Sequence, residues 1–144
     1  MKRGAFLLSI DLELGGSLAV IQRSREVTTR LLELMERFQI RATWAVMGHM
    51  FLDDPTNGVS SQYNKEIVQQ ILSCKVPQEI GCHTFSHMRV GAPSCSRECF
   101  ESDLRACQSA AEKIGVTLES FVFPWDSVGH VDCLAQYGFV AYRG

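Results

Sequence analysis

The stretch EIGCHTFSHM (residues 79–88) passes from a short apolar segment directly into two histidines, His83 and His87, four positions apart. The apolar segment, residues 78–82, has the length and composition of a buried strand. Imidazoles suit zinc and other late divalent metals, so the pair is a candidate metal site. An H-x3-H pair alone is more often an ordinary polar pair, and the rest of the chain must therefore distinguish the two interpretations.

Strand and helix patterns alternate on both sides of this stretch. Segments typical of strands are predicted at residues 5–10, 41–47, 78–82, 120–124 and 139–142. Helical spacing or helix caps occur between them, and a polar loop covers residues 53–58. This alternation indicates an α/β fold with a parallel sheet, whose ligand sites lie at the carboxyl ends of the strands.

The predicted helices have recognisable faces and caps. The first helix is expected to place four apolar residues on one face: Val27, Leu31, Leu34 and Phe38. Asn64 is a predicted cap for a second helix, and Ser96 for a third that ends at Gly115. A short helix is expected near residues 131–137.

The composition is that of one globular domain, residues 1–144, with 46% hydrophobic and 21% charged residues. A net charge of −2 provides no basic excess, so we expect neither nucleic acid nor an anionic membrane as partner. No stretch approaches the roughly 18 apolar residues of a membrane span. The start, MKRGAFLLSI, faintly resembles a signal peptide but lacks a cleavage site, and we interpret it as the first strand.

The six cysteines fit a reduced, cytoplasmic protein, because the chain can build a core without disulfides and shows no export signal. Cys95, Cys99 and Cys107 are close in sequence but lack the C-x2-C pairs of structural zinc sites. We expect these three cysteines to behave as small buried hydrophobic residues.

Polar residues follow the other predicted strands as well. Asp11 and Glu13 end the first strand, and PWDS (residues 124–127) follows the fourth. We expect these groups and the two histidines to meet at one rim. In a D-x-E pair, one acid can ligate a metal while the other, about 6 to 7 Å along an extended strand, can act as a base.

Four stretches together resemble the polysaccharide deacetylases, the NodB-homology domain, in order and approximate spacing. They are FLLSIDLELG (6–15), RATWAVMGHM (41–50), EIGCHTFSHM (79–88) and FVFPWDSVGH (121–130). The H-T-F-S-H motif is the most specific of them. The resemblance covers nearly the whole chain and implies a distorted (β/α) barrel of seven strands, of which about five are present.

The resemblance also implies a reaction and its residues. Members of this family remove N-acetyl or related acyl groups from sugars and polysaccharides with a divalent metal, usually zinc. Carried over, Asp11 becomes the catalytic base, and Glu13, His83 and His87 become the metal ligands.

Two departures from the family pattern shape our expectations. The family usually has an arginine in its proline motif that orients the catalytic acid, whereas Trp125 and Asp126 follow Pro124 here. Relatives also continue beyond VAYRG (140–144) to a late histidine that acts as general acid. We therefore expect an incomplete, open barrel that could form a homo-oligomer through its edge strands and that has little activity alone.

Two other functions remain open at this stage. One is an inactive metal- or glycan-binding pseudo-deacetylase fragment. The other is a doubly wound, magnesium-dependent receiver-like or phosphatase-like domain that uses Asp11 and Glu13. We also expect Trp44 to lie in the core and Trp125 to stack on a sugar ring. Thr84 and Ser86 are expected to fix the histidine loop by side-chain hydrogen bonds. We expect His49 to support the site or lie at the surface, and His130 to cap the short helix near Val131.

Overall fold

A computed structural model describes residues 5–13, 17–52 and 59–144, with only the backbone for residues 59–63. The basic start at residues 1–3 and the polar loop at 53–58 lie outside the described residues. The strands are β1 (Ser9–Leu12), β2 (Thr43–Val46), β3 (Glu79–Cys82), β4 (Ser120–Val122) and β5 (Ala141–Arg143). The α-helices are α1 (Leu18–Phe38), α2 (Val59–Leu72), α3 (Arg97–Glu112) and α4 (Val131–Leu134). Short 3-10 turns occur at η1 (Gly48–Phe51), η2 (Pro124–Asp126) and η3 (Ala135–Tyr137).

The five strands form one parallel sheet in the order β1-β2-β3-β4-β5. Each strand lies beside the next one in the chain, as in a (β/α) barrel, and the sheet is curled into a partial barrel. This confirms the predicted fold class. The doubly wound alternative is wrong, because that topology reverses the strand order at a switch point.

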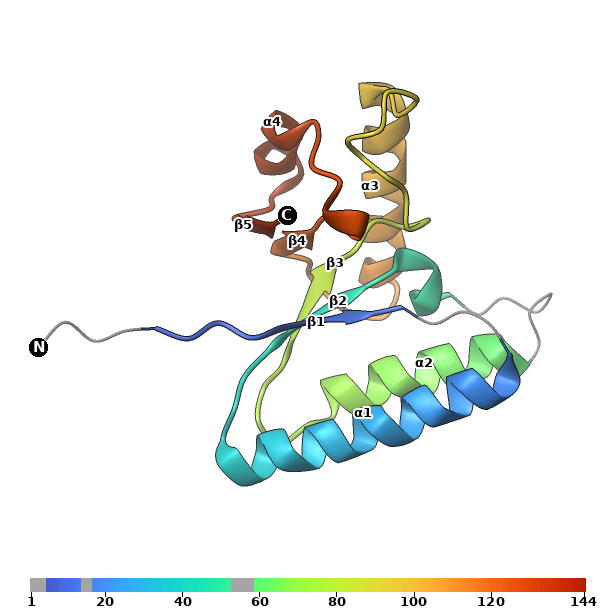
Figure 1. The fold of residues 1–144 in the computed structure, drawn as a ribbon, viewed down its shortest axis with the longest axis vertical. Helices are drawn as coiled ribbons and strands as arrows, with labels where there is room; N and C mark the ends of the chain where they lie inside the picture. Colours follow the sequence, from blue (N-terminus) through green and yellow to red (C-terminus); the bar gives the residue numbers. More distant parts are fainter. Residues whose placement is uncertain (1–4, 14–16, 53–58) are drawn as a thin grey trace, which may run out of the picture.

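Helices α1 and α2 lie side by side and run in the same direction (Figure 1). The predicted apolar face of α1 is wrong, since Val27, Leu34 and Phe38 are 47%, 48% and 59% exposed. The buried residues of α1 belong to a neighbouring stripe: Ile21, Thr28, Leu32 and Met35. The helix is apolar on more than one side, and spacing alone does not say which side meets the sheet.

The helix caps and strand boundaries in the structure agree only in part with those predicted from the sequence. Ser96 caps α3 as predicted, and its side chain accepts a hydrogen bond from the Cys99 N–H at 3.2 Å. Asn64 is not a cap, because α2 already begins at Val59. β1 begins at Ser9, later than predicted, so the apolar residues before it precede the strand.

The core lies between the sheet and its helices and is rich in aromatic residues. Trp44 is 1% exposed, as predicted, and its indole N–H donates to Gln78 Oε1 at 3.2 Å. Phe121 contacts Phe100 and Phe123 edge-on, with centroids 5.7 and 4.7 Å apart. All six cysteines are free thiols. Of the three expected to be buried, only Cys107 is; the expectation is wrong for Cys99, which is exposed, and for Cys95, which is half-buried. Cys82 and Cys133 are buried as well.

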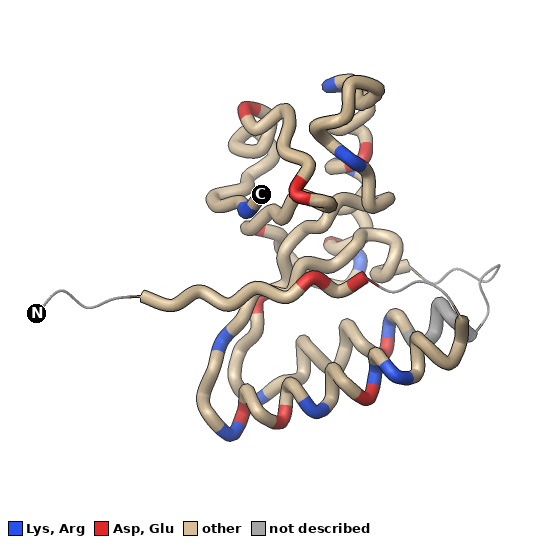
Figure 2. The backbone as a smooth tube through the Cα atoms, in the orientation of Figure 1, with Lys and Arg blue, Asp and Glu red and all other residues tan. Residues whose placement is uncertain are grey.

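Charged residues of both signs are mixed along α1 and α2 (Figure 2). These helices therefore present no basic stripe of the kind that binds a phosphate backbone. Within the described residues, no helix combines the length and the hydropathy that a bilayer crossing requires.

β1 and β5 are the outermost strands of the described sheet, and each pairs on one side only. Large apolar side chains beside these edges are exposed: Phe6, Leu7, Val140 and Tyr142. The curl of the sheet nevertheless brings the two edges within side-chain reach at one point, where Arg143 of β5 contacts Ser9 and Asp11 of β1.

Candidate metal centre

The predicted ligand atoms converge beyond the carboxyl ends of β1 and β3. One oxygen of Glu13 lies 3.4 Å from His83 Nε2 and 3.0 Å from His87 Nε2. All three ligand atoms lie within 4.8 Å of one another. The tertiary structure thus brings together the three residues that the family resemblance implied.

These spacings fit a divalent metal. Ligands about 2.0 to 2.1 Å from a tetrahedral zinc stand roughly 3.3 to 3.4 Å from each other. The exposures of the three side chains also differ: His83 is fully buried, His87 is 17% exposed and Glu13 is 49% exposed. Two imidazoles and a carboxylate with one side toward solvent match a site that keeps a position open for water or substrate.

The orientation of His83 is set by its second ring nitrogen. Nδ1 lies 2.9 Å from the carbonyl oxygen of Val122, at the end of β4. A carbonyl only accepts hydrogen bonds, so Nδ1 is the donor in this contact, and Nε2 is the ring nitrogen directed toward Glu13. A hydrogen bond of this kind is the usual support of a metal-binding histidine.

The loop between the two histidines is fastened to α3 by Asp103. This buried carboxylate accepts the backbone N–H of Phe85 at 2.5 Å and of Ser86 at 3.1 Å, and the Ser86 hydroxyl at 2.6 Å. Thr84 accepts the Met88 N–H at 3.2 Å. The predicted roles of Thr84 and Ser86 are confirmed, whereas Asp103 was not predicted. Its only sequence signal is an acid within the buried stripe of α3.

We expect Asp103→Ala to destabilise the fold by about 2 to 4 kcal/mol, because two loop N–H groups lose their acceptor. The same variant should weaken zinc binding, since the loop carries His87. Urea denaturation and a zinc competition titration would measure the two effects. Glu112→Ala is the matched control, because Glu112 is an exposed acid on the same helix. Equal stability of both variants would contradict this account of the loop.

Asp11, the predicted base, is two residues before Glu13 on β1 but does not join the ligand cluster. Its carboxylate instead contacts the guanidinium group of Arg143 through both oxygens. Arg143 was not predicted, and nothing in the local sequence marks it, since the two residues are 132 positions apart.

Trp125 stands next to the histidines on η2. Trp125 is 59% exposed, and its ring centroid lies 5.3 Å from that of His87. The Cζ atom of Arg89 lies 4.6 Å from the centroid of the Trp125 ring. Trp125 and Asp126 both have positive φ, 60° and 49°. Such conformations are uncommon for residues other than glycine and concentrate at functional sites.

The remaining two histidines have other partners. His49 Nδ1 lies 3.2 Å from the Phe85 carbonyl, which places His49 in support of the histidine loop, one of the two roles expected for it. His130 occupies the first cap position of α4, but its side chain makes no cap hydrogen bond, so the predicted capping role is wrong. Its ring binds the Cys95 carbonyl at 2.9 Å and stacks on Phe100 instead.

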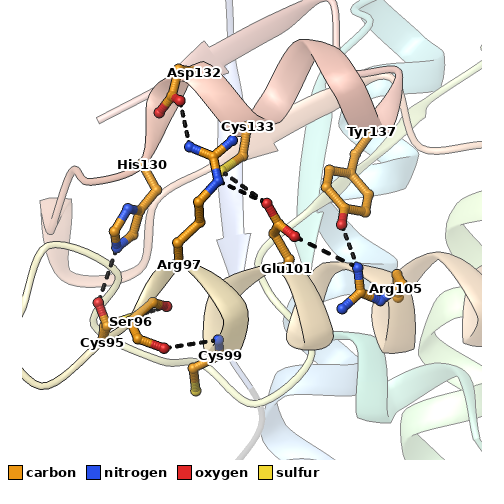
Figure 3. Close-up of polar contacts among 10 residues, drawn as sticks. All are labelled: Cys95, Ser96, Arg97, Cys99, Glu101, Arg105, His130, Asp132, Cys133 and Tyr137. Atoms are coloured by element: carbon orange, nitrogen blue, oxygen red, sulfur yellow. Dashed lines mark hydrogen bonds and ion pairs between the residues drawn. The ribbon is translucent and has the colours of Figure 1, made fainter.

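His130 lies at one end of a polar network that fastens α4 to α3 (Figure 3). At its centre, Arg97 binds Asp132 at 2.5 Å and Glu101 at 2.9 Å. The hydrogen bond from Arg97 lowers the pKa of Asp132, and the same bond raises the pKa of Arg97. These residues therefore stabilise the packing of two helices.

Comparison with known proteins gives one family and a set of similar structures. The family model for polysaccharide deacetylases matches residues 16–130, a range that includes both loop histidines and begins after Asp11 and Glu13. The chain is similar to a CE4 esterase from Streptococcus mutans, with 17% identity, a TM-score of 0.66, and coverage of 95% of this chain and 54% of that one. It is also similar to the peptidoglycan deacetylase PdaC from Bacillus subtilis, with 19% identity, a TM-score of 0.61, and coverage of 94% and 55%.

At these identities the two structures establish a shared fold only. The chain spans about half the length of each of them. Comparison with curated protein sequences gives no match.

Proposed function

Because this chain belongs to the polysaccharide deacetylase family, we propose that it takes part in metal-dependent removal of N-acetyl or related acyl groups from a carbohydrate or polysaccharide. The observation that carries this proposal is the convergence of Glu13, His83 and His87, whose ligand atoms all lie within 4.8 Å of one another. The similarity to a peptidoglycan deacetylase makes an acetylated bacterial polysaccharide a reasonable substrate class.

The proposed roles follow from position. Glu13, His83 and His87 would hold a divalent metal, with zinc the expected ion because two of the three ligands are imidazoles. When bound, such a metal supplies Lewis-acid polarisation of the acyl carbonyl and activation of water. Asp11, two residues before Glu13, would accept the proton of the attacking water.

Trp125 is the proposed contact for the sugar ring. Its indole is exposed beside His87, at the same rim as the ligand cluster. An aromatic face can cover the apolar C–H side of a sugar while the hydroxyl groups stay in water. The nearby guanidinium of Arg89 is placed to meet polar groups of the same substrate.

Acetate release from N-acetylglucosamine oligomers and from acetylated peptidoglycan fragments tests this proposal. We expect the zinc-loaded chain to release acetate slowly, consistent with the little activity expected of it alone, a chelator to stop the release, and added zinc to restore it. His130→Ala is a matched control, because the His130 ring binds the Cys95 carbonyl and lies outside the ligand cluster. Bound zinc without acetate release would instead identify an inactive metal- or glycan-binding domain.

We also expect the chain to self-associate through its sheet edges. Val140 is 81% exposed beside β5, and Leu7 is 92% exposed before β1. Exposed apolar edge strands invite pairing with another chain. Light scattering should therefore show a mass that rises with concentration, and Val140→Lys should reduce it. Val27→Lys, on the exposed side of α1, is the control and should have no such effect.

A further inference from the structure

The contact between Asp11 and Arg143 joins the two strands that lie farthest apart in the sheet order. Nη2 of Arg143 contacts both oxygens of the Asp11 carboxylate, one of them at 2.5 Å. Nη1 of the same group donates to the Ser9 hydroxyl. Ser9 and Asp11 are two positions apart and so share one face of β1. A planar guanidinium bound at three points fixes the direction of the carboxylate as well as its charge.

Arg143 is itself held by the strand that supports the metal centre. The Phe123 N–H donates to the Arg143 carbonyl at 2.9 Å, and Val122 lies in register with Arg143 in the β4–β5 pair. The carbonyl of Val122 is also the hydrogen-bond partner of His83 Nδ1. One short segment of β4 therefore positions both a candidate metal ligand and the arginine that contacts Asp11.

This arrangement accounts for the different positions of two nearby acids. Asp11 lies in β1 and Glu13 follows its last residue, Leu12, so a chain that stayed extended would present both acids to the same space. Only Glu13 joins the cluster with His83 and His87. Both oxygens of Asp11 are instead engaged by Arg143.

We propose that Arg143 is a positioning residue that keeps Asp11 out of the metal ligand set and holds it in place as the base. This inference rests on the proposed function for its catalytic half. Its structural half concerns only which acids ligate the metal and can be tested without turnover. The side chains of the pair are 35% and 38% exposed, so the pair contributes little to stability, and its effect should fall on the site.

Cobalt(II) is the probe for the structural half, because its visible absorption reports the number and type of its ligands. We expect Arg143→Met to change the absorption of the cobalt-loaded chain, as the released Asp11 becomes a ligand. Adding Asp11→Asn to Arg143→Met should restore the original spectrum. Arg105→Met is the matched control, because Arg105 pairs with Tyr137 and Glu101 on the distant helices. Its spectrum should equal that of the unmodified chain.

Hydrolysis tests the catalytic half. Arg143→Met should lower kcat on the order of 10- to 100-fold with little change in KM, because a misplaced base affects the chemical step. Arg143→Lys keeps the charge but loses the two-pronged contact. Its kcat should therefore lie between that of the unmodified chain and that of Arg143→Met. A thermal melt like that of the unmodified chain would show that the variants are folded.

The outcomes separate the two proposals. An unchanged cobalt spectrum in Arg143→Met would overturn this inference, and so would an unchanged kcat in an active chain. A chain that binds cobalt but releases no acetate would contradict the proposed function, while the spectra would still decide the role of Arg143. A chain that binds no cobalt would overturn both.

Discussion

Replacing His87 with alanine is expected to lower zinc affinity by well over tenfold, because a site with three protein ligands loses one of them. His83→Ala should have an effect at least as large. It removes a ligand that is fully buried and leaves the Val122 carbonyl without its hydrogen-bond donor. His87 is the cleaner test, since its side chain is 17% exposed and its loss disturbs the core less.

Zinc stoichiometry and a competition titration with a chromogenic chelator would measure this loss. His130→Ala serves as control, because its ring contacts the Cys95 carbonyl and lies outside the ligand cluster. If both ligand variants bound zinc with the stoichiometry and affinity of the unmodified chain, the metal site would have to be abandoned.

Asp11→Asn is expected to keep the metal and to lower hydrolysis by about 10²- to 10⁴-fold, the usual contribution of a general base. Asparagine has nearly the same shape but cannot accept the proton of water. Metal content and acetate release, measured on the same sample, would separate binding from chemistry. Asp126→Asn is the matched control, because Asp126 is an exposed acid on η2, next to Trp125.

The two measurements on Asp11→Asn can contradict the assignment in different ways. Loss of zinc would make Asp11 a ligand and reverse the roles of the two acids on β1. Full activity with zinc bound would assign the base to another group. Either result would also bear on Arg143, whose proposed role depends on Asp11 being the base.

Local patterns predicted the succession of elements well. Apolar runs of strand length and the Ser96 cap depend on neighbours in the chain, and the structure has five parallel strands and a cap at Ser96. The ligand set could be predicted because parallel strands place their carboxyl ends at one rim, and because the H-T-F-S-H motif is specific. Glu13, His83 and His87 lie together at that rim.

Errors arose where packing chose among locally equivalent options. α1 is apolar on more than one side, and the side with Ile21 and Leu32 is buried while that with Val27 and Leu34 is exposed. His130 is at a cap position, yet its ring finds a better partner in the Cys95 carbonyl. Residue spacing predicts which residues share one face of a helix, but not which part of the protein that face packs against.

The sequence by itself determined the order of strands and helices and the residues offered to a metal, because periodicity and strand-end chemistry are local properties. Only the tertiary structure decided how those residues are held. Asp103 reaches the histidine loop from α3, and Arg143 reaches Asp11 across 132 positions. Both contacts depend on how the sheet curls and where α3 packs. Those features arise from the burial of the whole core, which no short stretch of sequence specifies.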